Sequence, residues 1–164
     1  MKALSLLQPW ATLIMLGYKE YETRSWATQH RGTLAIAASA GKPAWAREVC
    51  ETDPIIRGIL AQHGLTFDTL PRGSVLGVVQ LTGMKRIVSV QHANCPDEVA
   101  PSQLKPVEVA AGDYTPGRWA WALSHVHAFA TPVPCKGALS LWQVPPEVEE
   151  QFPLSSSPIP PLPQ

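Results

Sequence analysis

The residues best suited to chemistry lie in one short segment, GYKEYETRSW, at positions 17–26. Its charged side chains are Lys19, Glu20, Glu22 and Arg24. Lysine and arginine can bind a phosphate or stabilise a developing negative charge, and a neighbouring glutamate can transfer a proton. The segment is therefore a candidate for binding an anionic ligand or for acid–base catalysis.

Both faces of this segment are polar, which is unusual for a half-buried strand. Alternation along an extended chain places one cation on each face. One face would hold Lys19, Tyr21, Thr23 and Ser25, and the other would hold Glu20, Glu22, Arg24 and Trp26. A strand with one buried face normally carries Val, Ile or Leu there. The segment is therefore either an ion-paired strand in water or the lining of a site.

Tryptophan residues flank the charged segment on both sides. Trp10 and Trp26 offer flat surfaces on which nucleic-acid bases can stack, and both are equally suited to anchoring a hydrophobic core. Three others lie in apolar stretches and are expected in the core: Trp119, Trp121 and Trp142.

The distribution of charge is more informative than its total. The 164-residue chain has a formal net charge of zero, yet residues 1–42 carry five cations against two acids. Three acids gather near the C-terminus: Glu147, Glu149 and Glu150. A neutral protein can still present a basic face to phosphate, so nucleic acid stays among the expected ligands.

Short elements must position these residues within one domain, since 45% of the chain is hydrophobic. Hydrophobic patterns and turn residues predict helices at 8–17 and 43–63, the second interrupted by Pro54. They predict strands at 2–6, from 19, and at 32–39, 73–90, 118–129 and 137–144. Residues 94–116 are expected to be rich in loops. The sequence thus predicts an α+β fold, a small β-barrel of five to six strands with two or more flanking helices.

The cysteine and histidine pattern does not favour a metal site or disulfides. Cys50, Cys95 and Cys135 are widely spaced and odd in number, which is typical of a reducing compartment. The four residues that could ligate zinc are His92, Cys95, His125 and His127. They lack the close double pairs of most zinc sites, so we expect no metal and no cofactor.

Several blocks of the sequence, in order, resemble one known family. The motif Gly-x-Lys-x-x-Glu-x-Arg is met by Gly17, Lys19, Glu22 and Arg24, after LSLLQPWATLIML and before HRGTLAIAAS. Later blocks also fit: GSVLGVVQL, RWAWAL and KGALSLWQV. Together they are similar to the ASCH (activating signal cointegrator homology) domain, a PUA-like relative of RNA-binding domains. The QPWA, RSW and HRG pieces resemble the branch found at the C-terminus of a eukaryotic transcription coactivator. The resemblance covers residues 2–145.

The resemblance implies a cleft between a PUA-like barrel and its helices, lined by the motif. RNA or DNA would lie across this cleft, held mainly through its phosphates. The nucleic-acid-binding residues expected are Trp10, Lys19, Glu22, Arg24, Ser25, Trp26, Arg31, Ser39, Lys42, Lys136 and Gly137. Ser39 and Lys42 also suit a helix cap and a surface lysine, and both interpretations stay open.

A hydrolase in the same cleft is the alternative. Some relatives hydrolyse acetylated cytidine with the motif lysine, a threonine three residues later and a glutamate on a later strand. Here those positions hold Lys19, Glu22 and Gln80, which argues against this amidohydrolase because the nucleophile and base are missing. Ribonuclease activity, known in other relatives, needs a cation and a base, and Lys19 with Glu22 could supply both.

The C-terminus is expected to lie outside the domain of residues 1–145. Residues 146–164 begin with a short acidic helix, PEVEEQF, and continue as the proline-rich tail PLSSSPIPPLPQ. The spacings Pro158–Pro161 and Pro160–Pro163 suit a polyproline II ligand of a protein partner, while a plain disordered terminus has the same composition. Truncation after Phe152 is expected to leave stability and binding unchanged.

No membrane association is expected. Gln8 and Pro9 interrupt the apolar opening of the chain, no signal-peptide cleavage site follows, and no stretch approaches the roughly 20 apolar residues of a membrane span. We therefore expect a cytoplasmic protein.

Overall fold

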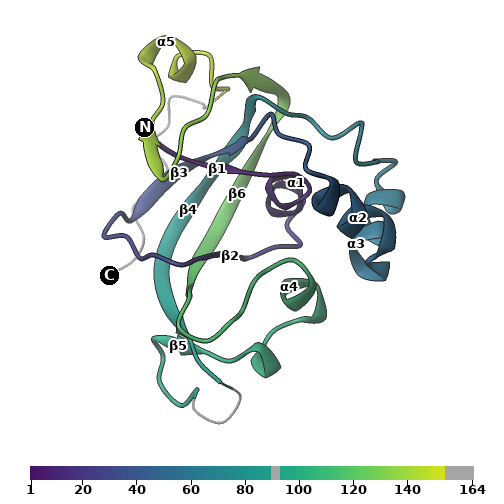
Figure 1. The fold of residues 1–164 in the computed structure, drawn as a ribbon. Helices are drawn as coiled ribbons and strands as arrows, with labels where there is room; N and C mark the ends of the chain where they lie inside the picture. The colour runs from purple at the N-terminus through teal and green to yellow at the C-terminus, as the bar shows by residue number, and fades with distance from the viewer. Residues whose placement is uncertain (90–92, 154–164) are drawn as a thin grey trace.

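The centre of the fold is a mixed sheet of seven strands (Figure 1). The structure is a computed structural model that describes residues 1–89 and 93–153. The strands are β1 (Lys2–Leu6), β2 (Tyr21–Arg24), β3 (Gly32–Ala38), β4 (Ser74–Ile87), β5 (Glu98–Val99), β6 (Trp119–Pro134) and β7 (Leu141–Gln143). Their order is β2-β6-β4-β3-β1-β7, with β5 beside β4. The predicted α+β fold is confirmed: the six predicted strands are present, and the very short β5 adds a seventh.

Strands β4 and β6 form the long curved spine of this sheet (Figure 1). They pair antiparallel, and their register shifts at three points between Ser74 and Met84. Such irregularities increase the local twist and bend the strands. The sheet becomes barrel-like but does not close, because its edge strands β2 and β7 do not pair with each other in the described part of the chain.

Helix α1 (Trp10–Met15) fills one face of the curved sheet. Its buried residues belong to two different apolar clusters: Ile14 packs with residues of the sheet, and Leu13 packs with residues of α2 and α3. The approach to β4 is close at Gly77, where an added Cβ would lie 2.5 Å from Met15 Sδ and 2.3 Å from the His127 carbonyl oxygen. A glycine is therefore required where α1 meets the spine.

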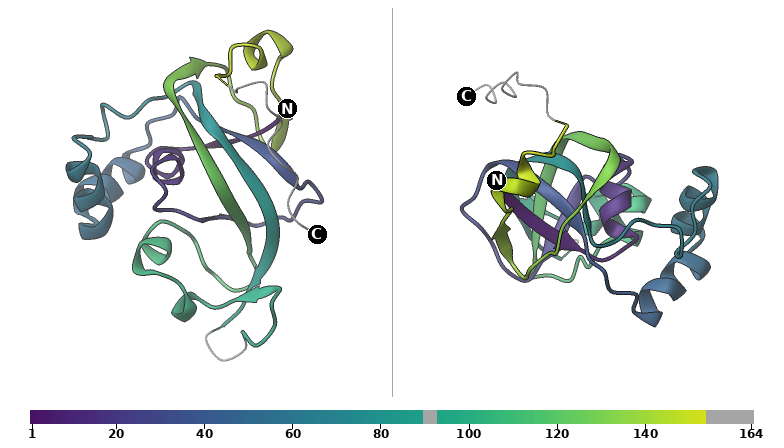
Figure 2. Two further views of the ribbon diagram at one scale, coloured as in Figure 1. Left: turned by 180° about the vertical axis from the view of Figure 1, so that it is seen from behind. Right: turned by 90° about the horizontal axis from the view of Figure 1, so that it is seen from above.

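Two helices stand beside the sheet and share an apolar cluster with α1. They are α2 (Ala44–Thr52) and α3 (Pro54–Gln62), and Figure 2 shows them projecting to one side of the sheet. Asp53 ends α2 and caps α3, since its Oδ1 accepts from the N–H groups of Ile55 and Ile56, both at 3.0 Å. The predicted interruption at Pro54 is confirmed.

The segment predicted to be rich in loops contains three short elements. They are β5, a 3₁₀ turn (Pro101–Gln103) and α4 (Pro106–Ala110). The strand predicted over 137–144 is shorter than expected. Ser140 has a positive φ of 57°, which interrupts an extended chain, so that β7 begins only at Leu141.

Packing continues past residue 145, where the domain was expected to end. Helix α5 (Pro146–Glu149) follows β7, and the Glu149 carboxylate binds the N-terminal ammonium group. Phe152 is buried, with its ring centroid 5.0 Å from that of Phe129. The packed unit therefore reaches Phe152. The proline-rich tail predicted after it lies outside the described residues.

None of the helices in residues 1–89 and 93–153 is long and apolar enough to cross a membrane.

Candidate functional site

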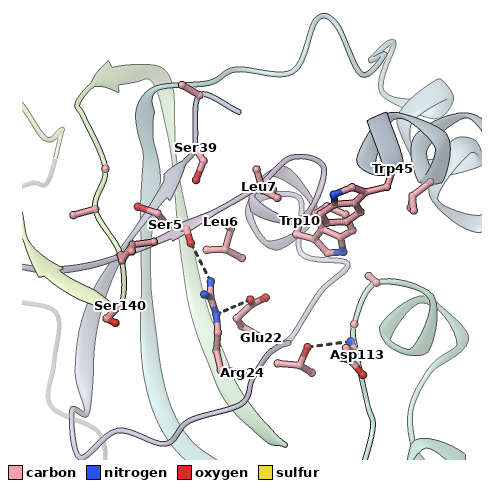
Figure 3. Close-up of a pocket in the computed structure, with 18 of the residues that line it drawn as sticks. Ser5, Leu6, Leu7, Trp10, Glu22, Arg24, Ser39, Trp45, Asp113 and Ser140 are labelled. Carbon is pink, nitrogen blue, oxygen red and sulfur yellow. Dashed lines mark hydrogen bonds and ion pairs between the residues drawn. The ribbon is translucent and has the colours of Figure 1, made fainter. Parts of the chain in front are cut away.

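An open pocket of about 930 Å³ lies where β1, β2, α1 and α2 meet the loop between β6 and β7 (Figure 3). Its walls come from parts of the chain that lie far apart in the sequence. The lining comprises residues 5–7, 22–24, 39–40, 110–113 and 136–140, with Trp10, Trp45, Val49, Gly73 and Arg118. Pockets of roughly 300–1,000 Å³ commonly bind small molecules, so this one can accept a group as large as a nucleotide.

The motif residues form a connected chain of polar contacts at the base of the pocket. Arg24 Nε donates to Glu22 Oε1 at 3.1 Å, and Arg24 Nη2 donates to the Ser5 carbonyl oxygen at 2.9 Å (Figure 3). The other carboxylate oxygen of Glu22 lies 3.5 Å from Lys19 Nζ. Glu22 thus sits between two cations, and the Arg24 side chain remains 25% exposed in a fixed orientation.

Lys19 differs from its predicted position. Its side chain is fully buried, it does not line the pocket, and its Nζ donates to the Ala111 carbonyl oxygen at 2.8 Å. The expected alternation is wrong here because β2 begins only at Tyr21. Lys19 precedes the strand, with its N–H bound to the Leu13 carbonyl oxygen, so it reaches Glu22 instead of the opposite face.

Two indole rings form the aromatic wall. The ring centroids of Trp10 and Trp45 are 5.3 Å apart, and their planes are tilted by 39°. Trp45, in the first turn of α2, is 54% exposed. Trp45 was not among the predicted site residues, although a tryptophan on the polar side of a predicted amphipathic helix can mark a binding surface.

The remaining predicted site residues divide into two groups. Ser39, Lys136 and Gly137 line the pocket beside Arg24 and Glu22. The others do not: Ser25, Trp26, Arg31 and Lys42.

Two of these four residues, Trp26 and Arg31, make local contacts outside the pocket lining. Trp26 packs edge-on against Trp121, with ring centroids 4.7 Å apart, so its core role is the one the structure supports. Arg31 Nη1 donates to the carbonyl oxygens of Thr28 and His30. Ser25 and Lys42 are exposed outside the pocket lining.

The structure adds one polar pair that the sequence did not indicate. Arg118, just before β6, lines the pocket with its Nε 3.3 Å from Asp113 Oδ2. The backbone N–H of Asp113 donates to Thr23 Oγ1 at 3.0 Å, which ties this wall to β2.

A second buried carboxylate, Glu108 on α4, lies behind this wall. The Tyr114 hydroxyl donates a hydrogen bond to Glu108 Oε2 at 3.1 Å, and the Glu20 backbone N–H donates one to Oε1. Burial raises the pKa of Glu108, although the hydrogen bond from Glu20 and the charge of Lys19 partly oppose that rise. α4 thereby fixes the chain just before β2.

The raised pKa of Glu108 predicts a specific dependence of stability on pH. The folded state holds this proton more tightly than the unfolded state, so the contribution is fully present below the ordinary glutamate pKa of 4.5. It is lost as the pH rises through the raised folded pKa. Urea unfolding from about pH 4.5 to 8 should show wild-type stability falling relative to Glu108→Gln, which cannot ionise. Parallel pH curves for the two proteins would contradict this prediction.

The residues considered for other chemistry lie elsewhere. Gln80 donates from its amide to Thr33 Oγ1 at 3.0 Å and does not line the pocket. Among residues 1–89 and 93–153, no three His, Cys, Asp or Glu side chains are grouped so as to hold a metal ion. His92, one of the zinc ligands considered, lies outside the described residues.

Comparison with known proteins gives consistent matches. The family model described as the ASCH domain matches residues 4–132. Activating signal cointegrator 1 from Homo sapiens is 44% identical over 78 residues, and the protein of the same name from Mus musculus is 41% identical over 78 residues. These alignments cover 48% of this chain but only 13% of either relative.

A solved structure supports the fold. The crystal structure of a mutant ZmASCH protein from Zymomonas mobilis matches with a TM-score of 0.50 and 15% sequence identity. The match covers 91% of this chain and 93% of the other chain. At this identity the likeness concerns the fold alone.

Proposed function

Because the chain belongs to the ASCH domain family, we propose that it binds nucleic acid across the pocket bordered by Arg24, Lys136 and the Trp10–Trp45 pair. The family resemblance predicted from the sequence is confirmed, since the family model covers most of the chain. The curated relatives are far longer than the matched region, so the proposal concerns this domain and not their overall activity.

The observation that carries the proposal is the pairing of a held cation with an aromatic wall. Arg24 is fixed by Glu22 and the Ser5 carbonyl oxygen, yet a quarter of its side chain is exposed. A guanidinium held in this way suits a phosphate oxygen, because little rotamer entropy is lost on binding. Exposed Trp45 supplies a surface for a base, which a surface ion pair alone would lack.

A hydrolase in the same pocket is the second candidate, favoured by the contact of Glu22 with Lys19 at 3.5 Å. Glu22 lines the pocket and could act as a base toward an RNA 2′-hydroxyl. Lys19 is buried and would act only through Glu22, so the direct stabilisation of charge would fall to Arg24. The amidohydrolase of acetylated cytidine is less well supported, since Gln80 does not line the pocket.

Fluorescence anisotropy with single- and double-stranded RNA and DNA tests the binding proposal. Wild-type protein should bind, with an affinity that falls as salt rises. Arg24→Ala should weaken binding about tenfold and lower the salt slope by about one, as expected for a lost phosphate contact. Arg57→Ala is the matched control, because Arg57 is exposed on α3 outside the pocket lining. Equal effects of the two substitutions would place the binding surface elsewhere.

A turnover assay separates the binder from the hydrolase. Purified protein is incubated with RNA and with acetylated cytidine, and the products are separated by chromatography. A hydrolase should lose about 100-fold or more in rate in Glu22→Gln, whereas a binder should show no turnover and a few-fold change in affinity. Turnover that depends on Glu22 would make the second candidate the better one.

A further inference from the structure

Two exposed apolar side chains on the lining of the same pocket indicate how a strand would bind there. We propose that Leu139 is a wedge that enters a base step of the bound nucleic acid, while the displaced base lies against Trp45. The inference rests on the proposed function and specifies its ligand. The preferred ligand is a strand with one unpaired or displaceable base, such as a bulge, and an intact duplex is a poorer one.

Leu139 is the most exposed large hydrophobic residue in the described part of the chain. Leu139 is 92% exposed, and Trp45 follows at 54%. The other three such residues, Val109, Val126 and Ile55, are between 37% and 43% exposed and do not line the pocket. Single apolar residues on a surface are common, but the two most exposed ones share one pocket here.

The loop that carries Leu139 is held firmly at both sides of this residue. Gly137 lies so close to β1 that an added Cβ would be 2.4 Å from Ser5 Oγ. That hydroxyl accepts a hydrogen bond from Trp142 Nε1 at 3.0 Å, which joins the loop region to β7. Ser140 has a φ of 57°, a conformation that costs energy for a residue other than glycine. Leu141, the next residue, pairs with Leu4 of β1, so the backbone is anchored to β1 on both sides of the outward-facing Leu139.

The aromatic wall lies across the pocket from this loop. Figure 3 shows the rings of Trp10 and Trp45 on the side of α1 and α2, Ser140 on the opposite side, and Arg24 with Glu22 between them. A strand that passes Arg24 would therefore meet an aliphatic side chain on one side and an indole ring on the other. Lys136, in the same loop as Leu139, can contact the adjoining phosphate.

A leucine on one side of the pocket and an aromatic ring on the other are suited to displacing a base from a stack. Apolar wedges such as leucine separate neighbouring base pairs, and the cost of unstacking is smallest where a base is already unpaired. Stacking on an aromatic ring then recovers part of that cost for the displaced base. The polar atoms of Arg24 and Glu22 at the base of the pocket can contact its edge.

Binding to matched probes tests the inference. The probes are a duplex with one unpaired adenine and its fully paired counterpart, each made in DNA and in RNA, with 2-aminopurine beside the bulge. Wild-type protein should prefer the bulged probe and raise 2-aminopurine fluorescence as stacking is lost. Leu139→Ala should lower that preference about five- to tenfold and reduce the rise in fluorescence. Trp45→Ala should weaken binding of the bulged probe by roughly 5- to 150-fold, with a smaller effect on the paired one.

Val126→Ala is the matched control, since it truncates an exposed aliphatic side chain on β6 outside the pocket. Melting temperatures of all variants check that the fold is kept. Equal binding of both probes by wild type, or an unchanged preference in Leu139→Ala, would overturn the wedge while leaving the proposed function intact. Failure of wild type to bind any probe would refute both. Comparing the DNA and RNA versions of each probe shows whether the site accepts deoxyribose, ribose or both.

Discussion

Replacing Lys19 by alanine is expected to lower the free energy of unfolding by about 3–5 kcal/mol, because it breaks a buried ion pair from one side. Lys19 is 1% exposed, donates to the Ala111 carbonyl oxygen at 2.8 Å and lies 3.5 Å from Glu22. Without the ammonium group, a buried carbonyl loses its donor and the mostly buried Glu22 keeps only its contact with Arg24 among the described residues. The melting temperature should fall by about 6–20 °C.

Urea unfolding of a double-mutant cycle provides the measurement. Lys19→Met fills much of the space but still leaves the Glu22 carboxylate without its buried partner. Lys19→Met combined with Glu22→Gln removes both charges and should recover part of the lost stability. Arg24→Ala, which removes the more exposed partner, should cost far less. A loss below about 1 kcal/mol in Lys19→Ala would show that this ion pair does not stabilise the domain.

The contrast between Lys19 and Arg24 shows what the sequence could and could not predict. The motif and its place beside a pocket followed from residue types, spacing and the family resemblance. Which cation would be accessible did not follow, because Lys19 is buried and binds the carbonyl oxygen of Ala111, which lies 92 residues later in the chain. Alternation along a strand is a local rule, and it does not apply to a residue that precedes the strand.

The pocket walls illustrate the same limit. The predicted helices and the break at Pro54 depend on local patterns, and the structure confirms them. Leu139 gave no signal in the sequence and Trp45 gave only a local one, because their exposure on a shared pocket depends on how α2 and the loop before β7 are placed against β1. Glu108 lay in a stretch predicted to be rich in loops, and its role depends on its burial against the chain before β2.

Removing Arg24 and Lys136 together is expected to weaken nucleic-acid binding by about 100-fold or more at low salt. Both side chains line the pocket, one from β2 and one from the loop before β7, so they can hold successive phosphates of one strand. Losing a hydrogen bond to a charged group costs about 1.5–3 kcal/mol of binding free energy. Because Lys136 is exposed, we expect its contribution at the lower end of this range. The salt slope should fall by about two, one for each phosphate contact.

The control for this double variant is Arg57→Ala with Lys2→Ala, which removes the same charge from two exposed positions outside the pocket. Anisotropy titrations across a range of salt concentrations should show nearly wild-type affinity for the control, apart from a small general loss of attraction. If both double variants lose affinity equally, attraction is spread over the surface, and the pocket is not the binding site. If neither loses affinity, phosphates contact other parts of the protein. Loss confined to Arg24→Ala/Lys136→Ala, with an unchanged melting temperature, would locate the strand in the pocket, because these two cations differ from the control pair in position and not in charge.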